Sequence, residues 1–98
     1  MVNATQVRTS HILVGSKDAA EAIRQNIVSG KTTFEEAAAA KSQCPSGKKG
    51  GDLGWFGRGR MVPPFERAAF AMNTKGELSA PVQTQFGWHL IKLVDFKK

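Results

Sequence analysis

The sequence has few of the features that mark secreted or membrane proteins. Its 98 residues include one cysteine, Cys44, which has no partner for a disulfide within the chain. No apolar run approaches the length of a membrane span. The first residues lack the charged segment followed by an apolar one that a secretory signal requires. These absences fit a reducing compartment, so we expect a cytoplasmic protein with no membrane partner.

Internal repeats and linker-like segments are also absent from the sequence. A chain of this length is just long enough to build one core, so we expect one domain over residues 1–98. The apolar fraction of 41% and the charged fraction of 22% are ordinary for a globular protein. We expect this domain to be a monomer.

Acidic residues are scarce, and the formal net charge is +6. Between Lys41 and Arg60 there are five basic residues and one acid, Asp52. A solvated basic loop is the simpler interpretation. The alternative is weak attraction of acidic peptides or nucleic acid. That attraction would be carried by Lys48, Lys49, Arg58 and Arg60. No zinc-finger or helix-turn-helix pattern is present, and aromatic residues do not alternate with the basic ones, so the solvated loop is favoured.

A strand followed by a helix is predicted for the first 30 residues. Residues 7–14 are rich in β-branched and apolar side chains, which is typical of a strand covered on both faces. Ser16 or Asp18 can cap the helix that follows, and Gly30 suits the position just after its end. The buried stripe of this helix would consist of Ala19, Ile23 and Ile27.

A second helix, a loop and a short strand are predicted next. Thr33 and Glu36 form a capping pattern before a helix that ends near Lys41. Residues 42–49 are rich in serine, glycine and lysine around one proline, which is loop chemistry. Residues 53–56 then form a short strand.

The last third of the chain predicts a helix and two extended segments. Pro64 opens the helix, with Phe65, Ala69 and Met72 on one face. Residues 77–84 form an edge segment, because Pro81 cannot donate to a β-ladder. A turn leads into a final strand over residues 88–94. The predicted order is therefore β-α-α-β-α-β-β, with the two longest strands at opposite ends of the chain.

Glycine is concentrated in one stretch, with five glycines between Gly50 and Gly59. Glycine is used where the backbone needs a positive φ or where another group must approach closely. Large apolar residues between and after these glycines cannot all turn inward. We therefore expect Leu53, Met61 and Phe65 to surround a shallow, partly exposed apolar pocket.

Two histidines stand inside apolar strands, His11 near one end of the chain and His89 near the other. Terminal strands of this kind often pair at the centre of a sheet, which would bring the two rings together. A single buried histidine is most often a hydrogen-bonded core residue, but two in matching positions indicate a shared network with Thr84, Cys44 or both. A metal site is not expected, because no third ligand of suitable type is evident.

Four motifs together resemble those of the parvulin-type peptidyl-prolyl cis/trans isomerases. They are Ser-His-Ile-Leu-Val at 10–14, Gly-Gly-Asp-Leu-Gly at 50–54, Met-Val-Pro-Pro-Phe at 61–65 and Phe-Gly-Trp-His-Leu-Ile at 86–91. Their order and spacing agree with that family over residues 7–94, which makes this range the motif-bearing core. The resemblance is to the small single-domain members.

The resemblance implies an α+β fold in which a four-stranded antiparallel sheet is wrapped by about four helices, as in parvulin and FKBP-like domains. It places a peptide in a groove on one face of the sheet. Carried over by position, the catalytic group consists of His11, Cys44, Thr84 and His89. The proline pocket consists of Leu53, Met61, Phe65 and Phe86.

The implied activity is non-covalent rotation of X-Pro bonds in flexible or unfolded protein segments, without any cofactor. The resemblance also implies that a phosphate before proline is not required, because phosphate-directed members carry a basic cluster in a long loop after the first strand. Here residues 15–18 pass almost directly into the helix, with Lys17 offset by Asp18.

Two alternative functions use the same residues. A chaperone-like module would hold peptides in the groove without significant catalysis. A thiol hydrolase would use Cys44 as nucleophile and His89 as base. The aspartate that relatives carry at the Cys44 position is a poor substitute nucleophile, so we expect a polar or electrostatic role for Cys44.

Overall fold

The computed structural model describes residues 4–98, which form four strands, three α-helices and one 3₁₀-helix. In chain order the elements are β1 (Gln6–Val14), α1 (Lys17–Val28), α2 (Phe34–Lys41), η1 (Pro45–Lys49), β2 (Asp52–Gly57), α3 (Pro63–Ala71), β3 (Val82–Thr84) and β4 (Gly87–Lys97). Within the described range, no helix has both the length and the apolar character that crossing a membrane requires.

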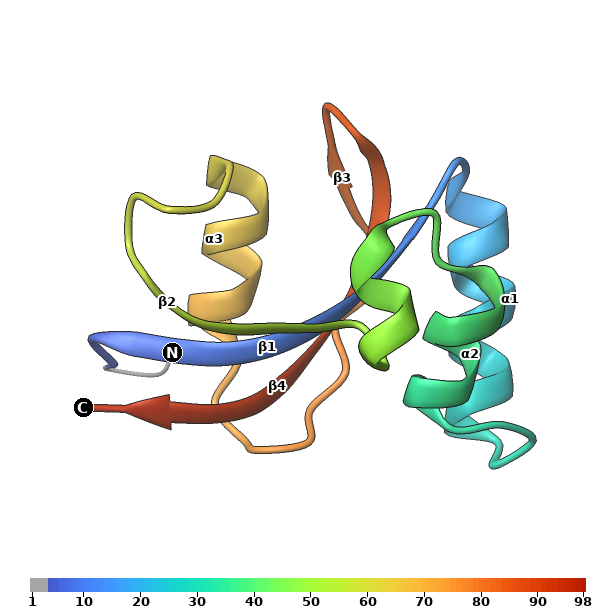
Figure 1. Cartoon of the computed structure of the whole chain (residues 1–98), viewed down its shortest axis with the longest axis horizontal. Helices are drawn as coiled ribbons and strands as arrows, with labels where there is room; N and C mark the ends of the chain where they lie inside the picture. The colour runs from blue at the N-terminus through green and yellow to red at the C-terminus, as the bar shows by residue number, and fades with distance from the viewer. Residues whose placement is uncertain (1–3) are drawn as a thin grey trace.

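The strands form one antiparallel sheet in the order β2-β1-β4-β3. The two ends of the chain therefore supply the central pair, and Figure 1 shows β1 and β4 side by side along the molecule. Leu13 pairs with His89, and His11 pairs with Ile91, so the two histidines lie on adjacent strands close to each other. This confirms the predicted pairing of the terminal strands and the predicted fold.

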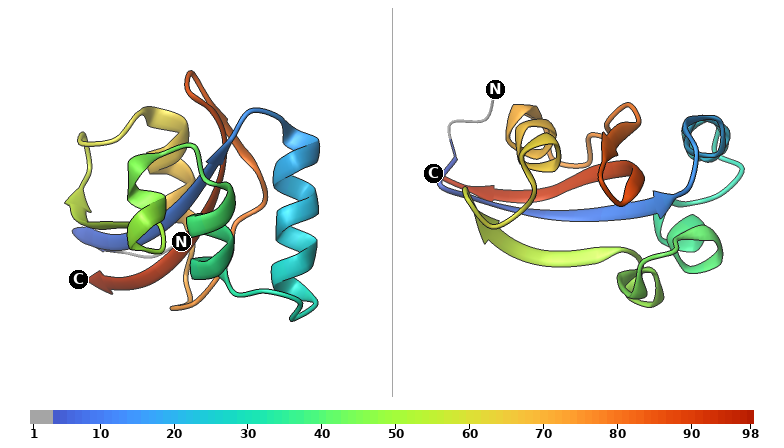
Figure 2. Two further views of the ribbon diagram at one scale, coloured as in Figure 1. Left: turned by 45° about the vertical axis from the view of Figure 1, so that its right-hand side comes forward. Right: turned by 90° about the horizontal axis from the view of Figure 1, so that it is seen from above.

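Helices cover both sides of this sheet. Seen from above, α3 lies on one side of the central strands, and α2 and η1 lie on the other (Figure 2). The core beneath α3 includes Val7, Phe56, Phe65, Phe70 and Ile91. The core beneath α1 and α2 includes Ile12, Ala20, Phe34, Ala38 and Leu90. The functional cavity described below lies on the α3 side.

Helix α1 begins after Ser16, whose Oγ accepts a hydrogen bond from the Ala19 N–H at 3.1 Å. The alternative cap at Asp18 is therefore wrong. Ala20 is the fully buried residue of this helix, whereas the predicted stripe of Ala19, Ile23 and Ile27 is only partly buried. Figure 1 shows α1 at one end of the sheet.

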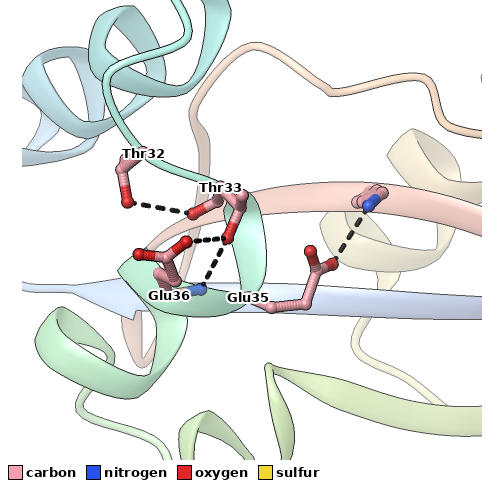
Figure 3. Close-up of polar contacts among 5 residues, drawn as sticks. Thr32, Thr33, Glu35 and Glu36 are labelled. Carbon is pink, nitrogen blue, oxygen red and sulfur yellow. Dashed lines mark hydrogen bonds and ion pairs between the residues drawn. The ribbon is translucent and has the colours of Figure 1, made fainter.

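Helix α2 begins as the sequence predicts, with Thr33 as its cap. The Thr33 Oγ1 accepts from the Glu36 N–H at 3.1 Å, and it also donates to the Glu36 carboxylate at 3.2 Å (Figure 3). In the same view, Glu35 turns toward β4, where its Oε2 lies 3.0 Å from the Lys92 Nζ. The helix start is thus fixed both to its own cap and to the central strand.

Two further segments differ from the prediction. Residues 42–49 contain the 3₁₀-helix η1, which the Gly47 N–H closes by donating to the Cys44 carbonyl at 2.9 Å. Pro45 is tolerated there because an N–H in the first helical turn has no hydrogen-bond acceptor within the helix, so its absence costs nothing. Strand β4 continues to Lys97, beyond the predicted end at residue 94, because the first half of β1 also pairs with it through Val7 and Phe96.

Candidate functional site

An apolar cavity of about 430 Å³ opens beside the central strands on the α3 side of the sheet. Most of the predicted site residues line it: His11, Cys44, Leu53, Met61, Phe65, Phe86 and His89. Thr84 lies behind the cavity surface and contacts it through His89. Arg60, named above among the four basic residues, also lines it, together with Leu13 and Val62, which the sequence did not single out. The folded chain therefore brings the predicted set together from β1, β2, β3, β4 and α3, from the residues just before η1 and α3, and from the β3–β4 turn.

The two histidines form a direct pair at the base of this cavity. Their Nδ1 atoms are 2.9 Å apart, and their rings stack with an interplanar angle of 19°. The His89 Nε2 lies 2.7 Å from the Thr84 Oγ1, and the His11 Nε2 lies 3.2 Å from the Ser46 Oγ. All four ring nitrogens thus have partners. Thr84 was expected in this network, whereas Ser46 was missed because it belongs to a segment predicted as a loop.

The network admits two proton arrangements that satisfy every ring nitrogen. A neutral imidazole carries one N–H, so only one of the two Nδ1 atoms donates. If His89 donates to His11, then His11 donates to Ser46 and Thr84 donates to His89. If His11 donates to His89, the whole chain runs in the opposite direction. Protonating both rings would set two N–H groups against each other, so at most one ring of the pair can carry a charge.

Burial acts in the same direction. His11 is 6% exposed and His89 is 4% exposed. Desolvation, with repulsion from His89 as a smaller cause, lowers the pKa of His11 from 6.5 to about 4. Desolvation also lowers the pKa of His89. At neutral pH both rings are uncharged hydrogen-bonding groups, which suits a rigid apolar site.

Cys44 lines the cavity, but neither histidine is placed to act as its base. The ring nitrogens of His11 and His89 are directed to each other, to Ser46 and to Thr84. The Cys44 backbone N–H donates to the Ser42 Oγ at 3.3 Å, which fixes the residue at the start of η1. The geometry therefore does not support the cysteine–histidine pair that a thiol hydrolase needs.

The glycine-rich stretch holds β2 against the strand that carries His11. The Gly51 carbonyl accepts a hydrogen bond from the His11 N–H at 2.9 Å, and Gly51 has a φ of 88°. A Cβ added at this residue would lie 2.5 Å from the His11 carbonyl oxygen. Only glycine permits this approach, which sets Leu53 at the cavity two residues further on.

Phe65 differs from the expectation of a partly exposed pocket residue. It is 3% exposed and belongs to the core beneath α3. Its ring meets both histidine rings edge-on, with centroids 5.7 Å from His11 and 5.3 Å from His89. Phe65 is buried because it lies in the first turn of α3, which begins at Pro63 and Pro64. Phe65 is therefore both a cavity residue and a core residue, whereas Met61 is partly exposed as expected.

The basic residues do not act as one cluster around the cavity. Arg60 lines it, but the Arg58 guanidinium lies 4.3 Å from the Phe70 ring centroid. Lys48 and Lys49 line other hollows. One of these, of about 440 Å³, contains the Arg8–Asp52 ion pair, whose charged atoms are 2.7 Å apart. Because its main charges neutralise each other, this polar hollow is a weaker candidate site than the apolar cavity.

An apolar cavity above a buried histidine pair, on a four-stranded antiparallel sheet, defines a domain of the parvulin class. Residues 4–95 match the rotamase family, described as the PPIC-type PPIase domain. The chain belongs to this family.

The relatives agree with that assignment. The chain is 49% identical over 85 residues to the peptidyl-prolyl cis-trans isomerase Pin1 of Arabidopsis thaliana, which covers 83% of this chain and 71% of that protein. It is 42% identical over 93 residues to the foldase protein PrsA of Exiguobacterium sibiricum, which covers 95% of this chain and 31% of the foldase. The chain thus spans about a third of the length of this foldase relative.

A solved structure shows the same fold. The crystal structure of the peptidylprolyl isomerase PrsA from Bacillus anthracis superposes with a TM-score of 0.92 at 42% sequence identity. The match covers 97% of this chain and 43% of that chain. The described elements are therefore those of a parvulin domain.

Proposed function

We propose that this chain catalyses cis/trans isomerisation of X-Pro peptide bonds in flexible or unfolded protein segments, without a covalent intermediate. The observation that carries the proposal is the apolar cavity closed at its base by a neutral, fully hydrogen-bonded histidine pair. Membership of the PPIC-type family supports it. The alternative of peptide holding without catalysis uses the same cavity and becomes an outcome of the test.

The chemistry requires shape rather than a nucleophile. Rotation about a peptide bond breaks amide resonance, with a barrier of about 18–20 kcal/mol. A site accelerates rotation if it binds the twisted transition state more strongly than the planar ground state. In our proposal Leu53, Met61 and Phe65 hold the proline ring, and Phe86, which is 62% exposed, covers it from the β3–β4 turn. The carbonyl before proline is then free to rotate.

The polar residues would support this geometry from below. We assign to His11 and His89 the role of fixing the centre of the sheet beneath Phe65, with Thr84 and Ser46 closing the network at either end. Cys44 would lie near the rotating carbonyl as a polarisable neighbour. In this proposal no proton is transferred, so activity does not depend on a charged histidine.

The decisive experiment measures isomerisation by exchange NMR on short X-Pro peptides, which needs no coupled protease. Without protein, the cis and trans forms of such a peptide interconvert over tens of seconds. We expect micromolar protein to produce measurable exchange between their NMR signals. Shifts of protein resonances around the cavity without exchange enhancement would instead identify a peptide-holding module. Peptide cleavage that alkylation of Cys44 abolishes would identify a hydrolase.

Phosphate independence is expected from the connection between β1 and α1. It consists of Gly15 and Ser16 alone, and the Lys17 Nζ lies over the Trp88 ring, 6.0 Å from its centroid. A dianionic phosphate therefore lacks the several charge-assisted partners that specific recognition requires. We predict that kcat/KM for matched Ser-Pro and phospho-Ser-Pro peptides differs by less than about tenfold (about 1.4 kcal/mol). A hundredfold preference that persists in added salt would contradict this prediction.

Cys44 is expected to act as a polar group and not as a nucleophile. We predict that Cys44→Asp keeps substantial isomerase activity, whereas Cys44→Ala loses more. The measurement is kcat/KM for both variants, with the free energy of unfolding as the control for folding. An inactive aspartate variant, together with an acyl adduct trapped on the unmodified protein, would show that the thiol attacks substrate.

Three further properties belong to the proposal. We propose that residues 1–98 act as one domain, since one sheet and two adjoining cores unite residues 4–98. We propose a cytoplasmic monomer, which the half-buried, unpaired Cys44 fits. Its partners would be proline-containing polypeptides, with weak attraction of acidic segments or nucleic acid by the exposed basic residues as a secondary property.

A further inference from the structure

We propose that Arg60 is a specificity-determining residue that favours substrates with a carboxylate side chain next to the proline. The proposal rests on the isomerase function above and concerns the same cavity. The four basic residues between Lys48 and Arg60 form one basic stretch in the sequence, but they differ in their position relative to the cavity. Arg60 lines the apolar cavity, and the other three do not.

The environment of Arg60 leaves its charge available to a ligand. Its side chain is exposed, and it directly precedes Met61, which is one of the residues that hold the proline in our proposal. Among residues 4–98 the ion pairs involve Arg8, Lys75 and Lys92, so Arg60 has no acidic partner there. Glu66, on the first turn of α3, instead accepts a hydrogen bond from the Gly59 N–H.

The cavity itself explains why one arginine is enough to affect specificity. Its other lining residues are apolar, a thiol or neutral histidines, so Arg60 supplies the only formal charge among the described residues that line it. Because the Arg60 side chain is exposed, its attraction to a substrate carboxylate is the modest one of a surface ion pair. A guanidinium can also bind a carboxylate through two parallel hydrogen bonds. In the proposed complex, an acidic side chain beside the proline would share the cavity with this group, because Arg60 and Met61 both line it.

The test compares matched peptides that differ in charge alone. One pair places Glu or Gln before the proline, and a second pair places Glu or Gln after it. We expect kcat/KM of the unmodified protein to be about threefold higher for Glu than for Gln in at least one pair at low salt, the size typical of one exposed charge pair. In Arg60→Gln this ratio should fall to about one, whatever the change in the absolute rate for either peptide.

Arg58→Gln is the matched control. It removes the same charge two residues away, from a side chain that packs on Phe70 outside the cavity. We expect it to keep the Glu/Gln ratio of the unmodified protein. Equal loss of the ratio in both variants would show that net charge, not Arg60, attracts the acid.

Two other outcomes would overturn the proposal. A ratio near one for the unmodified protein in both pairs would show that the cavity does not select acids. A ratio that Arg60→Gln leaves unchanged would place the selectivity elsewhere. If no peptide is isomerised at all, the proposed function fails instead, and peptide binding followed by NMR shifts still reports whether Arg60 selects the carboxylate.

Discussion

Phe65→Ala is expected to lower the free energy of unfolding by about 3–5 kcal/mol and to abolish most of the isomerase activity. The first effect follows from burial, because the ring is 3% exposed and packs in the core beneath α3. A loss of this size is a large fraction of the stability of a small domain. The second effect follows from its contacts, since the ring meets both histidines and lines the cavity.

Met61→Ala provides the comparison that separates folding from catalysis. Met61 also lines the cavity, but it is only partly buried. It packs against the core without being one of its buried residues. We expect it to lower kcat/KM by about tenfold, the effect of removing a few methylene contacts in a pocket. Its free energy of unfolding should change by about 1 kcal/mol or less.

Urea unfolding and exchange NMR on the same samples measure both quantities. If Phe65→Ala does not fold, Phe65→Leu keeps most of the apolar volume and should show both losses in smaller amounts. Unchanged stability in both Phe65 variants would mean that the ring is not part of the core. Full activity of Met61→Ala would show that Met61 does not hold the proline ring.

The sequence predicted the centre of this molecule better than its periphery. His11 and His89 could be paired from sequence because each interrupts an apolar strand, and the longest strands of a small sheet tend to occupy its centre. In the folded chain the register of β1 and β4 places the two rings together, as that pairing predicts. Thr84 was assigned by the family resemblance, and its Oγ1 lies 2.7 Å from the His89 Nε2.

The missed features depend on contacts that no local pattern contains. Ser46 reaches His11 only because residues 45–49 coil into η1, and a serine in a polar loop gives no sign of this. Phe65 looked like a partly exposed pocket residue because it follows the glycine-rich stretch, yet α3 carries it into the core. The capping patterns at Ser16 and Asp18 are both good, and only the entry of the chain from β1 selects Ser16.

The same contacts connect fold to function. Phe65 packs against the histidine pair, and the pair is fixed by Ser46 on η1 and Thr84 on β3. The floor of the cavity is therefore held by β1, η1, α3, β3 and β4 together. A site that binds a twisted peptide bond by shape needs such rigidity, because a floor that moved would accept the planar bond equally well.

Acidification from pH 7.5 to 4.5 is expected to lower the free energy of unfolding by about 2–3 kcal/mol. The pKa of His11 is about 4 in the folded protein and 6.5 as the ordinary value that the unfolded chain adopts. Between these values the unfolded chain binds more protons, so stability falls as pH falls through this range. The lowered pKa of His89 adds an effect of the same sign.

The carboxylates act in a different pH range, which makes the histidine effect measurable. Ion pairing and hydrogen bonds hold the pKa of Asp52 and of Asp95 below 3.8, so the stability they contribute is lost only at more acidic pH. Urea unfolding at several pH values gives the slope of the free energy of unfolding against pH. His11→Gln should reduce this slope between pH 6.5 and 4.5. NMR titration of the folded protein measures the same pKa directly and does not depend on the variant folding. A flat stability profile over this range, or a His11 pKa near 6.5 in the folded protein, would mean that the ring accepts a proton in place. The neutral pair would then not be the structural floor of the cavity.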